Sequence, residues 1–123
     1  MSATTPKSDL LHKSCRACAG QVKRLEESMV NSLLAEVPQW RRGGQTISRA
    51  FKFKNYYETM AFVNAVAWIA HHEDHHPDLA VGYNACTASY STHSAGGLTE
   101  NDFICAAKVD ALLEDAGVGD QSN

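Results

Sequence analysis

The chain has 123 residues, of which 44% are hydrophobic and 20% are charged, and its formal net charge is −3 at neutral pH. This length suits one domain with a genuine core, and the small acidic excess argues against a nucleic-acid-binding surface. No apolar run approaches the ~20 residues that span a bilayer, and the first 15 residues lack the apolar segment of a signal peptide. We therefore expect a cytoplasmic protein that binds neither membrane nor nucleic acid.

The N-terminal residues 1–19 are rich in Ser, Thr and Lys and show no sustained periodicity, which predicts a flexible tail. Within it, His12-x-x-Cys15-x-x-Cys18 could supply three zinc ligands or a redox pair. No second C-x-x-C follows and no strand precedes this motif, so we do not expect a metal there. Free thiols are the default for these cysteines in a reducing cytoplasm.

The next segment predicts a helix followed by a hairpin. Apolar residues recur at intervals of three and four over residues 21–37, which indicates an amphipathic helix that Pro38 ends. A Gly-Gly pair then separates two short extended runs, residues 39–42 and 46–54. Arg49 falls on the apolar side of the second run, so we expect either a bulge or a partner for its charge.

A long helix is predicted next. The capping pair Asn55-x-x-Glu58 opens it, and it must end by about His76, because residues before a proline, here Pro77, avoid helical geometry. Its apolar residues cover more than a third of its circumference, as expected for a helix that lies on a sheet. Trp68 falls on the opposite side, where it is either an exposed indole or a subunit contact.

The remaining pattern consists of two short strands, a final helix and a C-terminal tail: residues 79–83, 86–92, 99–116 and 117–123. The order is therefore α-β-β-α-β-β-α over a single domain, residues 20–116. This order predicts an α+β fold with antiparallel strands and helices on one face.

Four of the six histidines lie in residues 71–76, the run HHEDHH. An antiparallel hairpin brings the start of one strand beside the end of the next, so His93 should return beside His75 and His76. Imidazole, with an ordinary pKa of about 6.5, is suited to giving and taking protons near neutral pH. No nucleophile-elbow pattern is present, which favours acid–base over covalent catalysis.

A metal site is the main alternative for this run. Histidines four positions apart on a helix can chelate a divalent ion, and His72-Glu73-x-x-His76 also has the H-E-x-x-H spacing. Against it, no third ligand lies on an ordered element, and Pro77 follows where a metalloprotease helix would continue. The histidines could also be polar residues near a helix C-terminus with no chemical role. We favour the acid–base interpretation and expect no metal.

Several short motifs follow one another in the second half of the chain: His75-His76-Pro77, Tyr83-Asn84, Ser91-Thr92-His93 and Gly97-Leu98-Thr99-Glu100-x-Asp102. Upstream of them come Arg49-x-Phe51-x-Phe53-Lys54 and Phe62-Val63. This ordered set, over about residues 20–115, resembles the pterin-4a-carbinolamine dehydratase family. The resemblance implies a four-stranded antiparallel sheet with three helices packed on one face. It also implies a homodimer or homotetramer built through sheet edges and helices.

The resemblance further implies an activity. Family enzymes remove water from 4a-hydroxytetrahydropterin to give quinonoid dihydropterin, which recycles the cofactor of aromatic amino-acid hydroxylases. One group must protonate the departing hydroxyl and another must accept a ring-nitrogen proton. No metal or organic cofactor is implied, because the pterin is itself the substrate.

The resemblance assigns roles by position. His75 and His93 correspond to the acid–base pair, and His76 to a catalytic neighbour that positions the substrate. The implied substrate-binding residues are Asp74, His75, His76, Pro77, Ser91, Thr92, His93 and Ser94. The residues implied to support them from behind are His71, Glu73 and Asp102. Family members often carry an acid where this chain has His71.

A non-catalytic role is the second hypothesis. Members of the resembled family also act as dimerisation partners of a transcription factor, and relatives are implicated in carboxysome Rubisco assembly. Fold alone does not separate these uses. The presence of all three histidines favours chemistry, because a pure scaffold does not need them.

Overall fold

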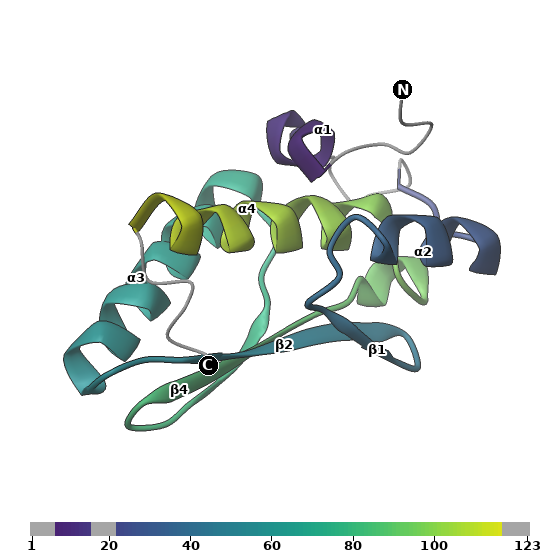
Figure 1. The fold of residues 1–123 in the computed structure, drawn as a ribbon. Coiled ribbons are helices and arrows are strands. Elements are labelled where there is room, and N and C mark those ends of the chain that lie inside the picture. The colour runs from purple at the N-terminus through teal and green to yellow at the C-terminus, as the bar shows by residue number, and fades with distance from the viewer. Residues whose placement is uncertain (1–6, 16–21, 117–123) are drawn as a thin grey trace.

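The computed structural model describes residues 7–15 and 22–116. Its helices are α1 (Lys7–His12), α2 (Glu27–Leu34), α3 (Tyr56–Glu73) and α4 (Glu100–Ala116), and its strands are β1 (Arg41–Gly43), β2 (Thr46–Lys52), β3 (Asp78–Val81) and β4 (Ala85–Tyr90). The strands form one antiparallel sheet in the order β1-β2-β4-β3, and the helices lie over one of its faces (Figure 1). The predicted α+β fold is confirmed. Within the described ranges, no helix is both long and apolar enough to cross a bilayer.

The core lies between the sheet and the helices. Alternate residues of the two central strands face inward, and the register pairs Ile47 with Tyr90 and Phe51 with Cys86. All four are at most 1% exposed. They pack in one cluster with α3 and α4, whose buried members include Phe62, Val66, Phe103, Ala106 and Val109. The two-residue alternation seen in the sequence therefore marks the inner face of the sheet correctly.

Helix α1 occupies part of the segment expected to be a tail. It lies beside α4 (Figure 1); Leu10 is completely buried, and Lys108 Nζ on α4 donates a hydrogen bond to the Leu11 carbonyl at 2.7 Å. The prediction of a tail was wrong for residues 7–15. A helix as short as α1 shows too little periodicity to be identified from the sequence. Its packing against α4 stabilises it here. The rest of the predicted tails, including Cys18, lies outside the described residues.

Helix α2 is shorter than the helix predicted over residues 21–37. Before it, the chain is extended at Glu26, and the Leu25 N–H donates to the Leu98 carbonyl at 2.8 Å. A backbone committed to that bond cannot join the helical ladder. After Leu34 the chain continues in tight turns up to Pro38, since a residue before proline avoids helical geometry.

A buried ion pair connects the sheet to α4. Arg49 Nη1 lies 2.7 Å from Asp110 Oδ1, and Trp40 Nε1 donates to the same oxygen at 2.9 Å. The Arg49 guanidinium also lies 4.5 Å from the centre of the Phe51 ring. The Asp110 side chain is only 2% exposed. The partner expected for Arg49 on the apolar side of its strand is therefore present.

Replacing Asp110 tests this pair. Asp110→Ala leaves the Arg49 charge without its carboxylate in a site of low solvent access, so we expect the free energy of unfolding to fall by about 3 kcal/mol. Urea denaturation measures the change.

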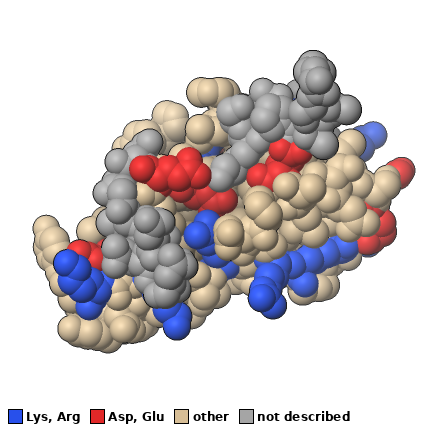
Figure 2. Space-filling model, viewed as in Figure 1, with Lys and Arg blue, Asp and Glu red and all other residues tan. Residues whose placement is uncertain are grey.

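The control is an ion pair on the surface. Basic side chains gather over β1, next to acidic ones at the adjoining end of α2 (Figure 2), and there Arg42 contacts Glu27 at 2.6 and 2.9 Å. Glu27→Gln should lower the free energy of unfolding far less than Asp110→Ala, because water screens the charges of an exposed ion pair. An equal loss in the free energy of unfolding for both variants would show that the Arg49–Asp110 pair contributes no more to stability than the surface pair.

Candidate active site

The end of α3 determines where the histidines of residues 71–76 lie. Asp74 adopts the left-handed conformation, with φ 54° and ψ 44°, which Asp tolerates better than most residues. Its N–H donates to the His71 carbonyl at 3.3 Å, and the His75 N–H donates to the Ala70 carbonyl at 3.1 Å. These two bonds form a Schellman motif. The helix ends at Glu73, and His75 turns into the interior, where it is 6% exposed.

This ending breaks the helical spacing of the histidines on which the metal alternative was based. His75 and His76 lie beyond the helix, so neither stands one helical turn from His71 or His72 on a common face. The H-E-x-x-H spacing therefore does not form its usual helical arrangement. Within the described ranges, no three His, Cys, Asp or Glu side chains are grouped so that they could hold a metal ion.

The buried partner of His75 is Asp102, in the first turn of α4. His75 Nε2 lies 2.7 Å from Asp102 Oδ1, and the Asp102 side chain is completely buried. Asp102 Oδ2 accepts the Thr92 hydroxyl and the Thr99 backbone N–H, both at 2.9 Å. Because a carboxylate only accepts hydrogen bonds, Nε2 must carry the hydrogen. In the neutral imidazole, Nδ1 is then left as an acceptor.

The end of β4 completes this arrangement. The Tyr90 ring stacks on His75, with centroids 5.8 Å apart and planes 8° from parallel. Thr92, two residues later, contacts both Asp102 and the Thr99 hydroxyl, the latter at 2.9 Å. The end of α3, the end of β4 and the start of α4 therefore meet at one point. The sequence predicted that His93 itself would lie beside His75 and His76; the contacts that the structure shows here are made by Tyr90 and Thr92.

His93 lies directly after Thr92 and is exposed, at the start of a 3₁₀ turn, η1 (His93–Ala95). It borders a hollow of about 220 Å³ whose lining residues are Gln45, Thr46, Ser91, Thr92, His93, Gly96 and Gly97. His76 is also exposed. Of the three histidines predicted to be catalytic, His75 is buried and hydrogen-bonded to Asp102, while His76 and His93 are exposed to solvent. A single pocket containing all three stays a prediction.

The other predicted site residues are distributed as follows. Ser91 and Thr92 line the hollow beside His93, Asp74 and Ser94 are exposed, and Pro77 is half-buried. His71 is exposed on α3.

Glu73 was expected to support the histidines from behind. Its carboxylate is instead engaged by the N-terminal segment and by α4. Oε1 accepts the Cys15 N–H at 2.8 Å, and Oε2 lies 3.7 Å from Lys108 Nζ.

Three residues of the site were not predicted from the sequence. Thr99 holds Asp102 and Thr92, Tyr90 stacks on His75, and Gln45 reaches the hollow from the β1–β2 turn. The spacing Thr99-x-x-Asp102 is that of a capping box and could have indicated this contact. Tyr90 and Gln45 carry no local signal, because their neighbours here are distant in the chain.

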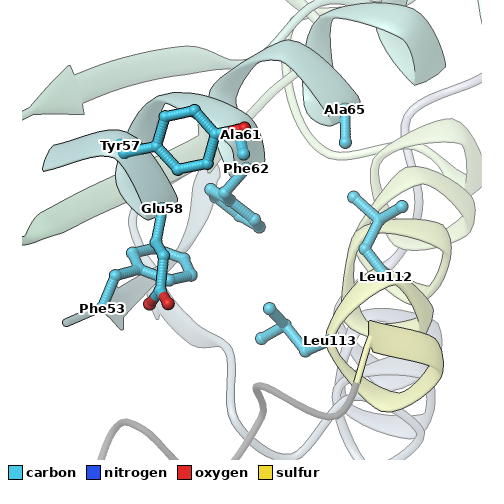
Figure 3. A pocket seen from close by; sticks show the side chains of 8 residues that line it. All are labelled: Phe53, Tyr57, Glu58, Ala61, Phe62, Ala65, Leu112 and Leu113. Atoms are coloured by element: carbon cyan, nitrogen blue, oxygen red, sulfur yellow. The ribbon is translucent and has the colours of Figure 1, made fainter. Parts of the chain in front are cut away.

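A second hollow, of about 250 Å³, lies between α3 and α4. Its lining residues are Phe53, Tyr57, Glu58, Ala61, Phe62, Ala65, Leu112 and Leu113, and leucines of α4 face aromatic side chains across it (Figure 3). Glu58 is its one ionisable carboxylate, and Glu58 Oε1 accepts the Lys54 N–H at 3.2 Å. None of the predicted site residues lines it.

Comparison with known proteins identifies the family. The model of the pterin 4 alpha carbinolamine dehydratase family matches residues 23–112. The chain belongs to the pterin-4-alpha-carbinolamine dehydratase family. Dehydratases named for this activity in Nitrosospira multiformis and Nitrosomonas eutropha are 55% and 58% identical to it, over 86% and 85% of this chain and 94% of each relative.

A solved structure agrees with this membership. A Brucella melitensis protein described as a transcriptional coactivator/pterin dehydratase has a TM-score of 0.70 and 36% identity to this chain. The alignment covers 73% of this chain and 98% of the Brucella chain. The resemblance drawn from the motifs is confirmed.

The tautomer of His75 in this pterin-dehydratase family member can be measured. If Asp102 holds Nε2–H, long-range ¹H–¹⁵N correlation spectra of the neutral imidazole should show the proton on Nε2. In Asp102→Ala that preference should be lost, because the acceptor is gone. A wild-type imidazole protonated on Nδ1 would contradict the arrangement.

Proposed function

We propose that this protein is a 4a-hydroxytetrahydropterin dehydratase, a carbon–oxygen lyase of the cytoplasm that recycles the pterin cofactor of aromatic amino-acid hydroxylases. Its family membership supports this, as do relatives at 53–58% identity that carry the dehydratase name. The observation that carries the proposal is the buried His75–Asp102 pair, which adjoins the end of β4 where Ser91, Thr92 and His93 border a hollow.

The reaction needs two proton transfers. The C4a–oxygen bond breaks with protonation of the leaving hydroxyl, a ring nitrogen loses its proton, and the products are water and the quinonoid dihydropterin. We assign the two transfers to His75 and His93, with His76 positioning the substrate. Acid and base together balance the protons, so the proposal requires neither a metal nor an organic cofactor.

The geometry suits His75 to the role of base. With Nε2–H held by Asp102, the imidazole can accept a proton only at Nδ1. The imidazolium that then forms is stabilised by the adjacent buried carboxylate, through a charge-assisted hydrogen bond. His93 is exposed at the hollow and can exchange protons with water, which suits the acid that protonates the leaving hydroxyl.

Alanine substitutions test these roles. His75→Ala and His93→Ala should each lower the dehydration rate roughly 10²-fold or more, because each removes one proton-transfer group. The rate is followed by absorbance as the quinonoid product forms from freshly generated carbinolamine, and circular dichroism checks that the variants fold.

The matched control is His72→Ala. The exposed His72 ring stacks on Trp68 at 4.9 Å and lies on the helix before the Schellman motif, so this variant should retain the wild-type rate. Wild-type rates from both His75→Ala and His93→Ala would overturn the assignment.

A non-catalytic, protein-binding role is less well supported. The Brucella neighbour is described as both a coactivator and a dehydratase, whereas the relatives at 53–58% identity carry the dehydratase name alone. We therefore retain catalysis as the proposed function.

We also infer that the protein works as a homodimer or homotetramer. Strands β1 and β3 are the edges of the sheet. On the helical side, Trp68 is 65% exposed, and an apolar hollow lies between α3 and α4 (Figure 3). Exposed apolar surface of this kind favours burial against another copy.

Light scattering after size-exclusion chromatography should therefore give two or four times the chain mass of 13.4 kDa. Trp68→Glu should shift the population toward smaller species if this indole lies in a contact between copies. A wild-type monomer at tens of micromolar protein would contradict the inference.

A further inference from the structure

Two cysteine thiols meet where the segment after α1 crosses α4. The Sγ atoms of Cys15 and Cys105 are 3.4 Å apart, and both residues are free thiols. A disulfide bond is about 2.05 Å long, so the sulfurs need to approach by about 1.4 Å to bond. They are separated by 90 positions in the sequence. Only the packing of the N-terminal segment on α4 brings them together.

The fold holds Cys15 in this position from two sides. Its backbone N–H donates to Glu73 Oε1 at the end of α3, at 2.8 Å. Lys108, three residues after Cys105 on α4, donates to the Leu11 carbonyl at 2.7 Å. The approach of Cys15 to Cys105 is therefore set by hydrogen bonds on both neighbouring helices.

The two thiols differ in burial. Cys105 is completely buried, and its hydrogen bond with Cys15 together with this burial raises the pKa of its thiol well above the usual range. Cys15 is half-buried, and its Sγ lies 3.7 Å from the Asn101 carbonyl. Cys15 is the less buried of the two residues, so we take its sulfur as the one that a reagent in solution meets first. The largest cause of the raised Cys105 pKa is its hydrogen bond with Cys15. That hydrogen bond is lost once Cys15 is in a mixed disulfide, so Cys105 is placed to act as the resolving thiol.

We propose that Cys15 and Cys105 are a redox modification site, at which a low-molecular-weight disulfide such as oxidised glutathione forms a reversible bond between α4 and the segment that follows α1. Reversible disulfides of this kind occur in reducing compartments as redox-responsive bonds. The proposal does not depend on the dehydratase activity.

The chemistry is two successive thiol–disulfide exchanges. The Cys15 sulfur attacks one sulfur of the oxidant, whose S–S bond breaks and releases one thiol carrying the Cys15 proton. The Cys105 sulfur then attacks the Cys15 sulfur and displaces the second thiol, which leaves with the Cys105 proton. Two cysteine thiols are oxidised and one small disulfide is reduced to two thiols.

The test uses the full chain in buffers of graded oxidised-to-reduced glutathione ratio. After the free thiols are blocked, digestion and mass spectrometry should reveal a peptide pair linked through Cys15 and Cys105. The bond closes a long loop, so the oxidised protein should melt about 10 °C higher than the reduced protein. Dithiothreitol should reverse both changes.

Two variants sharpen the test. Cys15→Ser should abolish the linked peptide and the rise in Tm, and it leaves the buried Cys105 side chain in place. Cys18→Ser is the matched control and should retain both. A bond between Cys15 and Cys18, a stable glutathione adduct on Cys15, or no crosslink at any ratio would each overturn the proposal.

Discussion

The carboxylate of Asp102 is the group on which the site and much of the surrounding packing depend. A completely buried carboxylate is costly unless hydrogen bonds compensate it, and here the compensation comes from three separate parts of the chain. His75 arrives from the end of α3, Thr92 from the end of β4, and the Thr99 N–H from the start of α4 itself. Displacing any one of them leaves the charge with fewer donors. The requirement that folds these elements together is therefore the same one that orients the imidazole.

The Schellman motif after Glu73 explains how one histidine-rich run acquires several environments. The left-handed Asp74 reverses the chain, so His75 enters the interior beside Asp102 while His76 stays exposed. Glu73 remains on the helix and bonds to the N-terminal segment. For proton transfer this division is useful, because one imidazole is fixed in orientation while others can exchange protons with water.

Helix α4 carries one member of the thiol pair, Cys105, and the carboxylate that holds His75, Asp102. Cys105 lies three residues after Asp102 on α4, and Tyr90 packs between these regions with its ring against His75. Burial raises the pKa of the Tyr90 phenol. The first two turns of α4 thus carry both the carboxylate that holds His75 and the thiol that faces the N-terminal segment.

The sequence by itself determined what adjacent residues encode: the order of helices and strands from α2 onward, the Asn55 cap, and the need of Arg49 for a partner. It also indicated the family, through motifs whose order resembles that of pterin-4a-carbinolamine dehydratases. Only the tertiary structure decided which groups meet. Asp110 pairs with Arg49, which is 61 positions away in the sequence, and Asp102 pairs with His75, which is 27 positions away. Periodicity and capping act within a few residues, whereas burial and the pairing of charges depend on segments that approach one another only when the sheet and helices pack.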